Sequence, residues 1–125
     1  MSMRPRKRRA RGSGRKSRRT AATRVDITVL KTMKPDEVFG SPPVRATYSD
    51  PCPVFREGQT ISVDARNPRM PEGFCKYAWD AIYPVGWEVV AQGMDHEWYE
   101  EPGKGLVVAA CPDGLRPVIF KLEWK

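Results

Sequence analysis

The sequence predicts an α+β fold, in which a small, mostly antiparallel sheet carries one main helix and is preceded by a disordered basic N-terminal arm. Three observations favour this class. Several short segments alternate apolar and polar residues, as half-buried strands do. One stretch, beginning at Phe74, places its apolar residues at helical spacing instead. No regular alternation of strands and helices is present, which argues against a parallel sheet.

The first strand is expected directly after the basic arm. Val25, Ile27 and Val29 alternate with polar residues, the pattern of a strand with one buried face. The segment KPDEVFG then predicts a single helical turn, because a proline and two acids occupy its start and a glycine follows it. The proline-rich segment SPPVRATYSDPCP predicts a loop or an edge strand, since proline cannot donate to a sheet.

A second strand and the main helix follow. After a Glu-Gly turn, Ile61 and Val63 alternate with polar residues and predict a strand. Beyond the loop RNPRMPEG, the apolar face of the expected helix consists of Phe74, Cys75, Ala78, Trp79 and Ile82. Pro84 and Gly86 predict that this helix ends or kinks near Tyr83. The next segment, WEVVAQG, fits either a helix or a strand.

The C-terminal segment predicts a β-hairpin. LVVAAC, PDG and LRPVIFKLEW form a strand, turn and strand pattern, and Asp113-Gly114 is a strong hairpin signal. Pro117 predicts an edge or a bulge in the second strand near that position. The acidic and aromatic segment HEWYEEPGKG, which precedes the hairpin, predicts an exposed loop.

Charge is divided sharply between two parts of the chain. Residues 1–24 contain eleven Lys or Arg and no acid, whereas residues 25–125 contain eleven bases and fifteen acids, a net charge of −4. We therefore predict a disordered arm over 1–24 and a single domain over 25–125. Nucleic acid or another polyanion is the partner expected for the arm, bound without base specificity because no aromatic residue interleaves it. The alternative is a solvated extension.

Several classes of protein are not expected. No apolar run approaches the roughly 18 residues of a membrane span, and the basic start is not followed by the apolar stretch of a signal peptide. We therefore predict a cytoplasmic protein without a membrane segment. The three cysteines are an odd number and should be reduced there, so a disulfide framework is not expected. No H-E-x-x-H, G-x-S-x-G or P-loop motif is present.

Four separated blocks, ITVLK, CPVFREGQ, MPEGFCKYAW and CPDGLRPVIFKLE, resemble a family of small bacterial and archaeal proteins of unknown function. Its members read C-P-x-F-x-x-G-Q, then M-P-x-G-F-C-x-W-A-W, then C-x-D-G-L-R-P-V. The resemblance covers about residues 25–125 and implies no activity, ligand or cofactor. The family pattern places cysteines at Cys52, Cys75 and Cys111. This chain has Ala110 where members often carry another cysteine, which weakens any four-thiolate site, and Tyr77 where they carry tryptophan.

The three cysteines form the candidate site. Cys52, Cys75 and Cys111 each lie next to a turn and beside an apolar run. Three thiolates gathered at one edge of the sheet could hold Zn²⁺, with His96, a carboxylate or water as the fourth ligand, or could hold an Fe–S cluster. They are far apart in the sequence, unlike the closely paired cysteines of strong zinc signatures. Packing in the core is therefore an alternative role.

A reactive thiol is the third alternative. Cys75 would lie at the start of the main helix, where the helix N-terminus stabilises a thiolate, and Arg116 could approach Cys111 through the hairpin. Arg116 is also a candidate for binding a carboxylate or a phosphate. Its alternative role is structural, as the partner of Asp113 or Glu57.

These features predict a non-catalytic binding module with a three-cysteine site and a basic arm that binds an anionic partner. One alternative is a small thiol-dependent enzyme that acts on an anionic substrate. The other is a nucleic-acid accessory protein in which only the arm functions.

Overall fold

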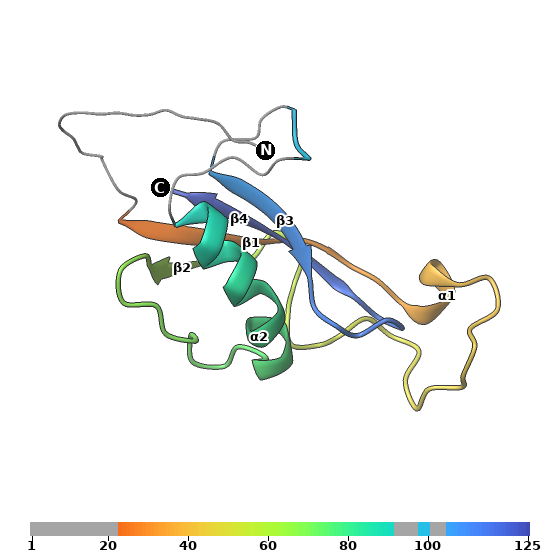
Figure 1. Ribbon diagram of the computed structural model, residues 1–125. Coiled ribbons are helices and arrows are strands. Elements are labelled where there is room, and N and C mark those ends of the chain that lie inside the picture. The colour runs from red at the N-terminus through yellow and green to blue at the C-terminus, as the bar shows by residue number, and fades with distance from the viewer. Residues whose placement is uncertain (1–22, 92–97, 101–104) are drawn as a thin grey trace, which may run out of the picture.

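One four-stranded antiparallel sheet and one helical layer make up the fold (Figure 1). The computed structural model describes residues 23–91, 98–100 and 105–125. Its elements, in chain order, are β1 (Arg24–Thr32), α1 (Pro35–Val38), β2 (Thr60–Asp64), α2 (Lys76–Val85), the π-helix η1 (Gly86–Val90), β3 (Leu106–Ala110) and β4 (Val118–Trp124). The predicted α+β class, with a small antiparallel sheet and one main helix, is confirmed.

The boundary between arm and domain lies slightly earlier than predicted. Arg24, which the charge pattern assigned to the arm, is the first residue of β1. Residues 1–22, where disorder was predicted, lie outside the described residues. Within the described residues, none of the helices has the length and apolar character needed to cross a bilayer.

The sheet has the strand order β2-β1-β4-β3, so β1 and β4 are its central strands. Their apolar residues face one another across the ladder, as the pairs Ile27↔Leu122 and Val29↔Phe120 show. The expectation that Pro117 would mark an edge strand or a bulge is not met. β4 begins just after Pro117 and is paired on both sides, and the shift of register lies in β1, between Val29 and Lys31.

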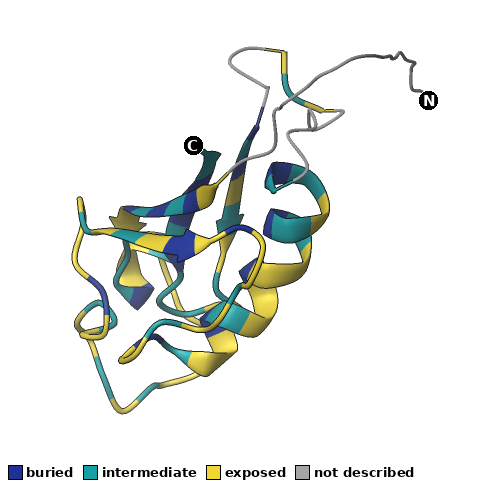
Figure 2. Ribbon diagram, turned by 90° about the vertical axis from the view of Figure 1, so that its left-hand side faces the viewer, coloured by how far each residue is buried: buried dark blue, intermediate teal, exposed yellow. Residues whose placement is uncertain are grey.

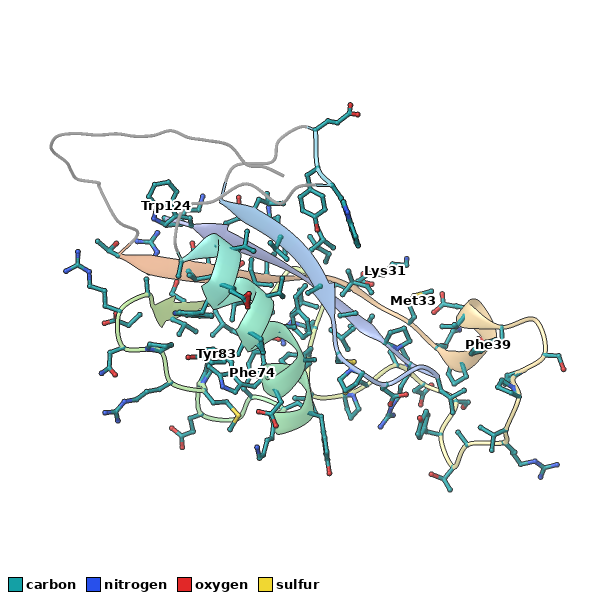
Figure 3. All side chains as sticks on the ribbon, in the orientation of Figure 1. Lys31, Met33, Phe39, Phe74, Tyr83 and Trp124 are labelled. Carbon is teal, nitrogen blue, oxygen red and sulfur yellow. The ribbon has the colours of Figure 1, made fainter. Side chains whose placement is uncertain are left out.

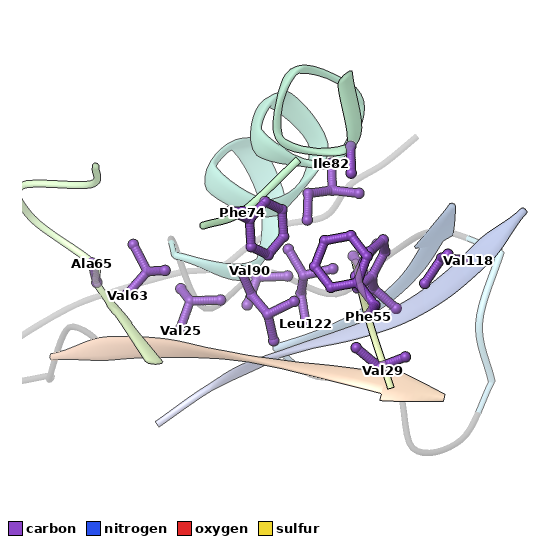
Figure 4. Close-up of a cluster of buried hydrophobic side chains, with 14 residues drawn as sticks. Val25, Val29, Phe55, Val63, Ala65, Phe74, Ile82, Val90, Val118 and Leu122 are labelled. Carbon is purple, nitrogen blue, oxygen red and sulfur yellow. The ribbon is translucent and has the colours of Figure 1, made fainter. Parts of the chain in front are cut away.

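The core lies between one face of the sheet and the helical layer (Figure 4). It includes three phenylalanines from different parts of the chain. The ring of Phe55 lies 4.8 Å from that of Phe74 and 5.0 Å from that of Phe120, in edge-to-face geometry. Phe55 therefore anchors the long loop between α1 and β2 to the core. Exposed residues predominate on the outer side of α2 and along the loops (Figure 2).

The main helix continues beyond the point where the sequence predicted its end. Pro84 lies inside α2, and the chain goes on as η1, closed by a hydrogen bond from the N–H of Ala91 to the carbonyl of Gly86 (3.0 Å). Gly86 is buried at the junction and packs against Leu122 of β4. Burial of Val90 adds to this packing, so tertiary contact overrides the local signals of proline and glycine. The segment WEVVAQG is accordingly helical at its start.

Candidate functional site

All three cysteines are free thiols, half buried, and packed against the hydrophobic core. Cys52 lies in the loop before Phe55. Cys75 is the N-cap residue of α2. Cys111 follows β3, and its Sγ accepts a hydrogen bond from the backbone N–H of Val118 at 3.3 Å. Each thiol therefore has a local packing role, whatever chemistry it also performs.

The described residues bring no metal-binding group together. Among residues 23–91, 98–100 and 105–125, no three His, Cys, Asp or Glu side chains lie close enough to one another to hold a metal ion. His96, the proposed fourth ligand, lies outside these residues. Zinc or an Fe–S cluster at Cys52, Cys75 and Cys111 therefore remains a prediction, without support from this part of the chain.

Cys75 lies where a helix could activate it. Its backbone is extended, and α2 begins at the next residue, Lys76. The thiol makes no side-chain capping bond to the first turn of the helix. The neighbouring ammonium of Lys76 is directed along the helix to Asp80, with its Nζ 2.9 Å from the carboxylate. The partial positive charge at the N-terminus of α2 is thus the feature that could stabilise a thiolate at Cys75.

Arg116 joins the hairpin to the proline-rich loop. Its guanidinium carbon lies 3.6 Å from the ring centroid of Tyr48, and its Nε lies 3.7 Å from Oδ2 of Asp113. Asp113 also accepts a hydrogen bond from the backbone N–H of Arg116 at 3.2 Å. Glu57, the other acid considered as a partner, instead accepts the N–H of Thr32 at 2.9 Å. These contacts give Arg116 a bracing role.

Tyr48 is the member of this cluster that the sequence did not reveal. Its hydroxyl donates to Oδ2 of Asp113 at 3.4 Å, across 65 positions of sequence. Partial burial, followed by the negative charge of Asp113, raises the pKa of Tyr48 above its ordinary value, with a smaller contribution from Cys52 and an opposing one from Arg116. A contact of this range leaves no periodic signal in the sequence.

An open hollow of about 410 Å³ lies beside the same tyrosine. It is lined by Pro35, Asp36, Pro42, Val44, Arg45, Ala46, Tyr48 and Ser49. The lining carries one acid and one base, and it includes none of the cysteines. The hollow is thus separate from the candidate thiol residues, and its charges select no ligand class.

The root of the basic arm is fastened to the sheet on both sides. Thr23 donates its N–H to the carbonyl of Lys125 at 3.0 Å and accepts the N–H of Ala65 at 3.1 Å. The carbonyl of Ala65 in turn accepts the indole N–H of Trp87 at 3.0 Å. The start of β1 therefore lies beside the end of β4 (Figure 1), and the arm leaves the domain at this point.

Comparison of the chain with family models, with curated proteins and with solved structures gives no match in any of the three. The resemblance to the small bacterial and archaeal family therefore stays a prediction.

Proposed function

We propose that this chain is a non-catalytic binding protein that holds a polyanionic partner through its basic arm, residues 1–23, since Arg24 belongs to β1. The observation that carries the proposal is the segregation of charge. Residues 1–23 contain ten Lys or Arg and no acid, whereas residues 24–125 contain twelve bases and fifteen acids, a net charge of −3. A run of cations without acids neutralises phosphates and releases their counterions, whereas the net negative charge of the remainder adds no overall attraction. Charge therefore selects the arm as the binding segment.

The attachment of the arm supports this role. Thr23 is hydrogen-bonded to Lys125 and to Ala65, and the strand it leads into, β1, is paired on both sides. A partner held by the arm is thereby linked to the centre of the sheet. The folded domain acts as the cargo or the adaptor that the arm brings to the polyanion.

A salt series tests the proposal. Binding of the full chain to a labelled oligonucleotide of about 30 nucleotides should weaken steeply between about 50 and about 200 mM salt, because each neutralised phosphate contributes roughly 0.7–0.9 to the slope of log K against log salt. Deleting residues 2–22 should abolish this binding. A variant with the same residues 2–22 in scrambled order is the matched control and should bind like the original. Undiminished binding after the deletion would refute the proposal.

A second candidate function is a small thiol-dependent enzyme that acts on an anionic substrate. One observation favours it, namely the position of Cys75 at the N-terminus of α2 without a capping bond. The rate of iodoacetamide alkylation should then rise at lower pH for Cys75 than for Cys52 and Cys111, measured in variants that keep one cysteine each. Three thiols that all titrate near ~8.5 would remove the basis of this alternative.

A further inference from the structure

We propose that the arm prefers single-stranded nucleic acid, and that the bound strand continues from the arm onto a basic and aromatic surface of the folded domain. This inference rests on the proposed function. We call the surface the stacking surface, and it consists of Arg66, Arg69 and Tyr83. The first two residues lie in the loop between β2 and α2, and the third lies on α2.

The stacking surface begins where the arm ends. The backbone of Ala65 binds both neighbours, since its N–H donates to Thr23 at the root of the arm and its carbonyl accepts the indole N–H of Trp87. Arg66 is the next residue along the chain. Thr23 is therefore next to the loop that carries Arg66, and Trp87 lies on the other side of Ala65.

The two arginines of this surface keep their charges available. Arg66 and Arg69 are exposed, and neither forms a salt bridge with any residue that the structure describes. Glu72, the acid nearest to Arg69 in the sequence, forms no salt bridge with any residue that the structure describes. The acid nearest to Arg66 is Asp64, which shapes the turn. Its Oδ1 accepts the backbone N–H groups of Arg66 at 2.8 Å and Asn67 at 3.1 Å. By contrast, Arg24 at the start of β1 is paired with Asp26 at 3.0 Å.

Tyr83 supplies the aromatic ring of the surface, and it is linked to the loop through Trp87, whose indole N–H donates to the carbonyl of Ala65, the residue before Arg66. The centroid of its ring lies 5.2 Å from that of Trp79 and 5.2 Å from that of Trp87, and the two indoles are 5.7 Å apart. The three centroids thus form a nearly equilateral triangle, so the indoles do not enclose Tyr83 from opposite sides. The residue is 36% exposed. In Figure 3 it is labelled on the side of α2 that faces the loop before the helix.

This combination selects unpaired bases. Proteins that bind single strands join a positively charged track to aromatic rings on which bases stack, and the faces of bases are available for this only when the strand is not in a duplex. A duplex or an acidic polypeptide would engage the cations of the arm but would have no base to stack on Tyr83. The stacking surface therefore turns a charge-driven interaction into a preference for single strands.

The test compares single-stranded DNA, single-stranded RNA and duplex DNA of one sequence, with the full chain and fluorescence anisotropy. We expect tighter binding to the single strands, and we expect Tyr83→Leu to weaken that binding by about fivefold or more while leaving duplex binding unchanged. Tyr77→Leu is the matched control, because Tyr77 is also on α2 and is 76% exposed but lies outside the surface. Arg66→Gln with Arg69→Gln should lower the salt slope for single strands by about 1.4.

Two outcomes would overturn the inference. One is equal affinity for the single strands and the duplex, and the other is the same response to Tyr83→Leu as to Tyr77→Leu. Either result, combined with loss of all binding after deletion of residues 2–22, would leave the proposed function standing. Tight binding to heparin or to an acidic polypeptide, but to no oligonucleotide, would also overturn it.

Discussion

Replacing Gly86 by alanine should destabilise the fold by about 1 kcal/mol, although alanine is the better helix former. The new Cβ would lie 2.5 Å from Cδ2 of Leu122, far inside van der Waals contact. Leu122 is itself 0% exposed, so the surrounding core restricts its movement. Overpacking of this kind costs about 1–3 kcal/mol, and the helix propensity of alanine returns about 0.5–1 kcal/mol, which leaves a net loss.

Urea unfolding followed by tryptophan fluorescence measures this loss. Gly40→Ala is the control, because nothing lies within 4 Å of the Cβ it would add, and its stability should stay within about 0.5 kcal/mol of the original. Leu122→Ala alone should cost about 2–5 kcal/mol. The double variant should be more stable than the sum of its parts by about 0.5 kcal/mol or more, since the shortened residue makes room for the methyl group. Additive effects, or a Gly86→Ala variant as stable as the original, would refute the steric argument.

Three further predictions concern the described residues. Burial alone would raise the pKa of Asp26, but hydrogen bonds from Ser62 and Arg24 outweigh it and hold that pKa below its ordinary value of 3.8. The stability advantage of the original over Asp26→Asn should therefore be full above pH ~5 and should shrink as the pH falls below ~4. Unfolding curves taken across this pH range measure it. Arg116→Lys should lower the free energy of unfolding by about 1 kcal/mol, because an ammonium stacks less well on Tyr48; no change in urea unfolding would argue against the bracing role. The predicted metal site at Cys52, Cys75 and Cys111 requires stoichiometric zinc or iron in protein purified anaerobically without a histidine tag, and metal-free protein by elemental analysis would count against that site.

The strands could be predicted because their signal is local. Val25, Ile27 and Val29 alternate with polar neighbours, and the structure buries all three on one side of β1. Ile61 and Val63 mark β2 in the same way. The change of period at Phe74 indicated α2, although Phe74 and Cys75, predicted on its apolar face, precede the helix, which begins at Lys76. In each case a single buried face imposes the pattern, so the residues themselves record it.

The rest depends on contacts between distant segments. Pro84 and Gly86 predict a helix end, yet Gly86 packs on Leu122 and the helix continues into η1. The cluster of Tyr48, Asp113 and Arg116 unites a proline-rich loop with a hairpin. Neither event follows from local spacing, because the partner residues come from elsewhere in the chain. The convergence of the cysteines was a hypothesis of the same long-range kind.

The hydrogen bond between Thr23 and Lys125 has a practical consequence. Because the first and last described positions of the domain touch, a circular permutation could join them through a short glycine linker and open the chain elsewhere, such as in the exposed loop at residues 40–45. The basic arm would then be attached at a different position on the domain. Such a permuted chain would separate the effect of the charge of the basic arm from the effect of its attachment point on the domain.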